Sequence, residues 1–225
     1  MRRTLLGCLL ALLLCPGMGW STQLGSDACG GTGGLGANWT VVTGFELPQQ
    51  TGGICQPNTL NVYAHALYTA VTWPNDQYAS VKVVAANTSA SRIVIVALRG
   101  STAARTNYEC VVAGPLGTAA TLTIYRYNAG TPTVLAGGTA VYTVNSGDIM
   151  HCEIQGSTII LKINGGPVLG PVVDGSPIVS GSAGIGVYSA DGAITDAKGD
   201  DWLGGDFAGG GGGTSGHHLL LGVGQ

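Results

Sequence analysis

Short runs of β-branched and aromatic residues recur along this chain, and glycine, proline or asparagine separates most of them. Runs of this kind at regular spacing are typical of the strands of an antiparallel sandwich or barrel. Beyond the first residues, no stretch has the i, i+3, i+4 apolar spacing of a helix. The sequence therefore predicts an all-β fold, an antiparallel two-sheet β-sandwich. The predicted strands are 66–72, 78–85, 92–98, 107–112, 120–127, 133–135, 140–144, 148–155, 158–163, 168–173 and 183–189.

Alternation within the runs predicts which side chains face inward. In 148–155 the apolar residues alternate with polar ones, so His151 and Glu153 are predicted to face solvent or a groove. The run 92–98 is apolar on both faces, which predicts a central strand covered on each side. The glycine-rich segment before residue 60 is predicted to be irregular, with its first strand at 39–42.

The ends of the chain differ from its middle. Two arginines, an apolar run from Leu5 to Leu14 and small residues near Gly19 are typical of a secretory signal peptide. That run is too short to span a bilayer, although a short buried helix is an alternative. The predicted divisions are a signal peptide at 1–20, one β-sandwich domain at 24–207 and a glycine-rich flexible tail at 208–225. The protein is predicted to be secreted, and no cysteine fits a lipoprotein signal.

Four cysteines follow the predicted signal peptide, namely Cys29, Cys55, Cys110 and Cys152. In an exported chain they indicate two disulfides, for which three pairings exist. Cys110 and Cys152 both lie on strand faces that are predicted to point into the core. We therefore favour Cys110–Cys152 together with Cys29–Cys55, and buried free thiols are the alternative.

Charge is scarce. Only 9% of the residues are charged, the net charge is −3, and no basic run is present. Binding to nucleic acid or to an anionic membrane surface is therefore not supported.

Two parts of the chain resemble concanavalin A-like jelly-roll modules of the laminin-G and glucanase type. The segment GGLGANWTVVTG (33–44) resembles their opening strand, and GDDWLGGDF (199–207) resembles part of their closing strands. The likeness covers most of 24–207 and is a pattern of strands and turns without a catalytic signature. It implies a jelly-roll sandwich of the kind found in exported bacterial and phage proteins.

The resemblance also raises the question of catalysis. Glucanases of this fold carry catalytic carboxylates on one strand, and a retaining mechanism needs two carboxyl groups about 5–5.5 Å apart. The chain has three glutamates, Glu46, Glu109 and Glu153, and none has a second carboxylate on its strand face. Catalysis is thus uncertain and disfavoured, and Glu109, His151 and Glu153 are interpreted as solvent-side positions that could contact a ligand.

Aromatic rings are the other binding candidates. Tyr125 and Tyr127 share one face of a predicted strand with threonines, which indicates its wetter side, and Trp73 lies in a loop that could present its ring. Trp39 and Trp202 are expected to pack in the core. We predict a secreted, non-catalytic jelly-roll module that binds carbohydrate or another cell-surface or matrix ligand. The alternatives are a structural or adhesive assembly protein, and a glycoside hydrolase or lyase with an atypical site.

Three acidic residues suggest a structural calcium ion. Asp27 lies near the start of the predicted domain and Asp200 and Asp201 near its end, and jelly rolls often bind calcium where the chain ends meet. Calcium needs six to eight oxygen ligands, so a solvated acidic pair in a turn is the alternative. No other cofactor is predicted, and the sequence determines neither the ligand nor the oligomeric state.

Overall fold

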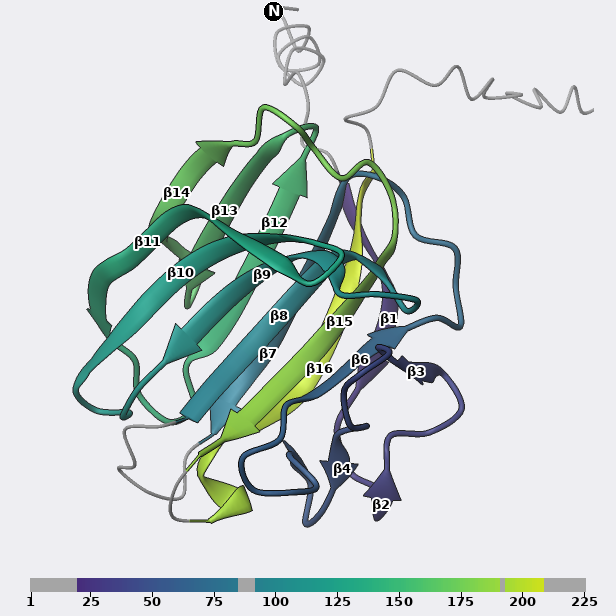
Figure 1. Ribbon diagram of the computed structural model, residues 1–225, viewed down its shortest axis with the longest axis vertical. Helices are drawn as coiled ribbons and strands as arrows, with labels where there is room; N and C mark the ends of the chain where they lie inside the picture. The colour runs from purple at the N-terminus through teal and green to yellow at the C-terminus, as the bar shows by residue number, and fades with distance from the viewer. Residues whose placement is uncertain (1–19, 85–91, 191–192, 209–225) are drawn as a thin grey trace, which may run out of the picture.

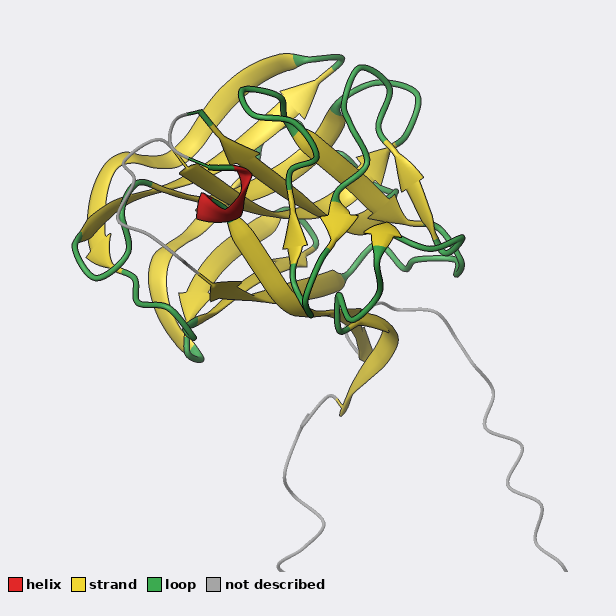
Figure 2. Ribbon diagram, turned by 90° about the horizontal axis from the view of Figure 1, so that it is seen from below, coloured by secondary structure: helices red, strands yellow, loops and turns green. Residues whose placement is uncertain are grey.

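The computed structural model describes residues 20–84, 92–190 and 193–208. These residues form two antiparallel β-sheets packed face to face, with one short 3-10 helix at Ile194–Asp196 (Figures 1 and 2). The predicted all-β sandwich is therefore confirmed. Nearly all of the predicted signal peptide and tail lie outside the described residues. Within the described ranges, no helix is long and apolar enough to cross a membrane.

The larger sheet has nine strands, and its last strand pairs with its first. β1 (Trp20–Asp27) runs antiparallel to β16 (Lys198–Ala208), which brings the two ends of the described chain together (Figure 1). The order of the other strands across the sheet is β14 (Gly166–Val173), β13 (Thr158–Ile163), β12 (Ile149–Gln155), β7 (Gln77–Val84), β16, β5 (Cys55–Gln56), β4 (Gln49–Gln50) and β2 (Gly33–Gly34).

The smaller sheet has seven strands, with β8 at its centre. Its order is β11 (Thr131–Thr143), β10 (Ala119–Asn128), β9 (Thr106–Ala113), β8 (Arg92–Ser101), β15 (Ser182–Ser189), β6 (Ala64–Tyr68) and β3 (Trp39–Val41). β8 is buried on both faces along nearly its whole length, so its prediction as a covered central strand is confirmed.

Two strand predictions need correction. The runs 133–135 and 140–144 belong to one strand, β11, because Gly137 and Gly138 with positive φ form a bulge between them. A Cβ on Gly137 would lie 2.2 Å from the carbonyl oxygen of Leu122, so glycine is needed there. The first described strand is β1 and not the predicted 39–42. The prediction missed β1 because this segment is polar and has no β-branched run.

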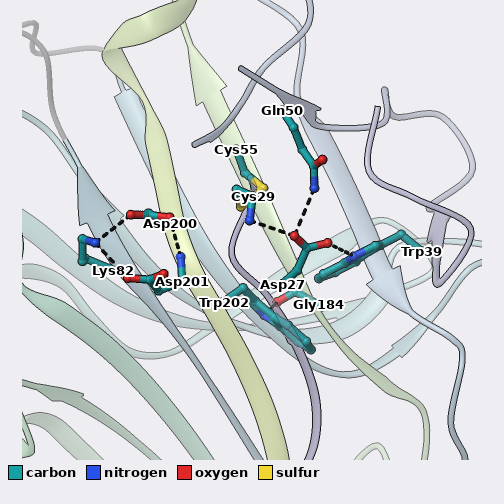
Figure 3. Close-up of a disulfide and its surroundings, with 10 residues drawn as sticks. All are labelled: Asp27, Cys29, Trp39, Gln50, Cys55, Lys82, Gly184, Asp200, Asp201 and Trp202. Carbon is teal, nitrogen blue, oxygen red and sulfur yellow. Dashed lines mark hydrogen bonds and ion pairs between the residues drawn. A yellow bond between two sulfur atoms is a disulfide. The ribbon is translucent and has the colours of Figure 1, made fainter. Parts of the chain in front are cut away.

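The core lies between the sheets and is crossed by a disulfide. Cys110 on β9 is bonded to Cys152 on β12, and Cys29 is bonded to Cys55 (Figure 3), so both predicted pairings are confirmed. Since Cys110 faces the core, Glu109 beside it on β9 must face outward.

Aromatic packing dominates one end of the core. The ring centroids of Trp39 and Trp202 are 4.7 Å apart, which confirms their predicted core positions. The prediction of Trp73 as a presented ring is wrong, since its side chain is only 8% exposed. Its indole N–H donates to the carbonyl of Tyr68 at 2.7 Å, and its ring packs edge-on against Trp202.

Candidate functional site

A row of tyrosine rings and one arginine lies on the outer face of the seven-stranded sheet. Tyr188 and Tyr63 stack with centroids 4.1 Å apart and an angle of 18°. The Arg105 guanidinium lies 5.6 Å from the Tyr63 ring centroid and 3.6 Å from that of Tyr127, and Tyr125 is 5.7 Å from Tyr127. All five side chains are half-buried. We call these five residues the tyrosine platform.

Strand parity places two of these rings. Tyr125 and Tyr127 are separated by Arg126 on β10, so they share a face, as predicted. Arg126 points the other way and its Nη1 donates to Asp174 at 2.6 Å. Arg105 comes from the turn between β8 and β9 and stacks on Tyr127 from above the sheet.

Glu109 lies beneath the platform. Arg105 donates from Nε to Oε1 at 2.8 Å and from Nη2 to Oε2 at 2.6 Å, and Asn107 donates to Oε1 at 3.0 Å. Glu109 is 0% exposed, so the prediction of a solvent-side position is wrong. Its strand face does point outward, but Arg105 covers it. A ligand therefore meets the rings and the guanidinium, and the carboxylate holds the guanidinium in place.

His65 on β6 is buried beside this ion pair. Its Nδ1 lies 3.7 Å from Oε1 of Glu109, and neither ring nitrogen has a hydrogen-bond partner in the described part of the chain. Burial lowers the pKa of His65 to about 4, although the Glu109 carboxylate opposes the shift. The imidazole is therefore neutral at neutral pH.

His65 makes the fold sensitive to mild acid. Its pKa is lower in the fold than in the unfolded chain, so its contribution is complete above pH 6.5 and is lost as the pH falls toward 4. We expect the free energy of unfolding to fall by about 2 kcal/mol between pH 7 and pH 5. Urea unfolding at both pH values measures it. His65→Leu should flatten this pH dependence, whereas His151→Leu, which leaves His65 buried, should keep it. If stability depends equally on pH in the wild type and in both variants, His65 is not the group responsible.

The platform is suited to binding rather than to proton transfer. Burial raises the pKa of Tyr127 to about 12 and also raises the pKa of Tyr63, so both phenols stay protonated. The hydrogen bonds from Arg105 and Asn107 occupy both oxygens of Glu109. What remains for a ligand is apolar ring surface, phenol hydroxyls and the outer N–H groups of the guanidinium.

His151 and Glu153 lie on the outer face of the other sheet. Oε1 of Glu153 accepts hydrogen bonds from Nε2 of His151 at 2.9 Å and from Nζ of Lys162, beside a pocket of about 220 Å³. Burial would raise the pKa of Glu153, but these two hydrogen bonds lower it below its usual value. The polar face of this strand is confirmed. Because Glu109 faces outward from the opposite sheet, the two glutamates cannot act as a retaining pair.

The predicted calcium ligands do not fit a calcium ion. The Asp27 carboxylate accepts hydrogen bonds from the backbone N–H of Cys29, the indole of Trp39 and the amide of Gln50 (Figure 3). A cation at this point would face N–H donors, whereas calcium needs oxygen ligands. Asp200 and Asp201 both bind Lys82. No cluster of three or more His, Cys, Asp or Glu that could hold a metal occurs among the described residues.

The fold is shared with carbohydrate-active and lectin structures. No protein-family model matches the chain, and no curated protein sequence is detectably similar to it. The carbohydrate-binding module CBM66 from Bacillus subtilis superposes with a TM-score of 0.53 at 16% identity, over 73% of this chain and 91% of that module. A β-1,3-1,4-glucanase (lichenase) from a mouse hindgut metagenome gives a TM-score of 0.54 at 13% identity, over 81% of this chain and 98% of the enzyme. The chain has the concanavalin A-like jelly-roll fold.

A lumenal lectin-like domain shares the same architecture. The exoplasmic/lumenal domain of VIP36, solved with Ca²⁺ and mannose bound, gives a TM-score of 0.52 at 11% identity, over 74% of this chain and 82% of that domain. At such low sequence identity, these superpositions establish the jelly-roll fold alone. The side chains of this chain must therefore carry any functional argument.

Proposed function

We propose that this chain is a non-catalytic carbohydrate-binding module whose tyrosine platform binds sugar rings. The observation that carries the proposal is the line of half-buried rings from Tyr188 and Tyr63 through Arg105 to Tyr127 and Tyr125. The flat face of a tyrosine suits the apolar face of a pyranose, and its hydroxyl can bind the sugar hydroxyls.

Two kinds of observation support this function. The Glu109 carboxylate under the platform is committed to Arg105 and Asn107, which leaves recognition and not chemistry to its surface. The structural neighbours include a carbohydrate-binding module and a domain solved with mannose bound. Two disulfides are consistent with the proposed secretion to an oxidising compartment.

Removal of the two rings on β10 tests the proposal. We expect the double variant Tyr125→Ala/Tyr127→Ala to lose retention on a glycan array by at least about tenfold, because few ring contacts carry most of the binding energy at such sites. Tyr142→Ala is the matched control, since Tyr142 is 39% exposed on β11 and outside the platform. Thermal unfolding of each variant checks that it is folded. Undiminished retention by the double variant would refute the platform as the binding site.

A further inference from the structure

A second pocket lies at the glycine-rich edge of the larger sheet. Its volume is about 330 Å³, and Glu46, Gln49, Asn58 and the glycines of β2 line it. Glu46 is held in place by its backbone: its N–H donates to Tyr63 at 3.0 Å, and its carbonyl accepts from His65 at 2.9 Å. Phe45, the preceding residue, has its ring 5.2 Å from the Arg105 guanidinium. The pocket therefore adjoins the tyrosine platform through neighbouring residues.

One oxygen of the Glu46 carboxylate has no hydrogen-bond partner. Its Oε2 is buried without a hydrogen bond, and no cation of the described residues lies within 4.0 Å of it. The other two glutamates differ, because Glu109 is bound by Arg105 and Glu153 by Lys162. The Glu46 side chain is only partly buried and lines the pocket, so a ligand there can meet the carboxylate. Because no cation of the described residues balances this charge, a ligand that supplies a positive charge and N–H donors would bind favourably.

The walls of the pocket indicate the rest of the ligand. Gln49 donates from Nε2 to the carbonyl of Pro57 at 3.2 Å, which leaves its Oε1 free to accept a hydrogen bond. Asn58 is exposed and offers an amide. Gly33 and Gly34 have no side chains, so a ligand can approach their backbone. One carboxylate with amides and bare backbone complements an ammonium group on a hydroxylated ring.

We propose that this pocket is a subsite for an amino sugar with a free, protonated amine, which binds Glu46 through its ammonium group. The hydroxyls of the sugar bind the amides of Gln49 and Asn58. The inference rests on the proposed function only in taking the ligand to be a carbohydrate, because the subsite shares no residue with the tyrosine platform.

The test compares two probes that differ in one group, the hexasaccharide of glucosamine and the hexasaccharide of N-acetylglucosamine. Isothermal titration calorimetry of the full chain should show that the glucosamine probe binds at least about tenfold more tightly, as a charge-assisted hydrogen bond requires. Glu46→Gln should abolish this preference. Asp201→Asn removes the same charge from an exposed position beside Lys82 and should keep the preference.

Three results would overturn the subsite. They are no preference in the wild type, a preference that survives Glu46→Gln, and an equal loss in Asp201→Asn. Unfolding without ligand gives a fourth readout: Glu46→Gln should be at least as stable as the wild type, and a clear loss of stability would reveal a protein partner for Glu46.

If the array shows tyrosine-dependent retention without any amine preference, only this inference fails. If the variant Tyr125→Ala/Tyr127→Ala keeps both its retention on the array and its preference for the amine, only the proposed role of the tyrosine platform fails.

Discussion

Replacement of Arg105 by methionine is expected to lower the free energy of unfolding by about 3–5 kcal/mol. The variant would leave Glu109, which is 0% exposed, without the guanidinium that binds both of its oxygens. The Asn107 amide would remain as a donor, but it carries no charge to balance the carboxylate. Urea unfolding at pH 7 measures the loss.

An ion pair that is less buried supplies the matched control. Lys162→Met breaks the pair with Glu153, in which both side chains are partly exposed, so its cost should stay below about 1 kcal/mol. The double variant Arg105→Met/Glu109→Met should recover most of the stability, since it removes both charges together. Equal losses in Arg105→Met and Lys162→Met would contradict the stabilising role assigned to the Arg105–Glu109 pair.

This ion pair shows where inference from the sequence ends. Alternation along β10 correctly places Tyr125 and Tyr127 on one face, because strand parity is a local property. The same rule points Glu109 outward, but nothing local reveals that a residue of the preceding turn covers it. Tyr63 lies directly before β6 and Tyr188 lies on β15, and these two strands are neighbours only through the sheet order. The composition of the platform is therefore a tertiary property.

Strand prediction succeeds and fails for related reasons. The run 158–163 matches β13 in full, because its apolar residues alternate and turns bound it. β1 and the second half of β16 are polar or rich in glycine, and they become strands by pairing with each other. Cysteine pairing could be predicted, since Cys110 and Cys152 occupy core-facing positions on their strands.

Two candidate site residues have surroundings that the sequence did not predict. Trp73 follows β6 in a loop, but its indole turns back to the carbonyl of Tyr68 and so fills the core. Asp27 was predicted to bind a cation, yet donors from Trp39 and Gln50 converge on it. The packing of Trp73 against Trp202 and the donors around Asp27 come from residues that are not adjacent in sequence, which composition and spacing cannot reveal.

Removal of the disulfide between the sheets is the second change with a large expected effect. Cys110→Ala/Cys152→Ala should lower the free energy of unfolding by roughly 4 kcal/mol, because the bond closes a loop of 42 residues and so restricts the unfolded chain. Denaturant unfolding under non-reducing conditions measures the loss. Far-ultraviolet circular dichroism establishes that the variant keeps its strands.

The second disulfide is an equally buried comparison that closes a shorter loop. Cys29–Cys55 closes a loop of 26 residues, so its removal should cost only about 0.4 kcal/mol less if chain entropy dominates. All four cysteines pack in the same core cluster at 0% exposure, so a cavity would add to the cost in both variants. A loss several kcal/mol larger for the cross-sheet pair would therefore contradict loop length as the main difference between the two bonds. A loss below about 1 kcal/mol would contradict its role in joining the two sheets.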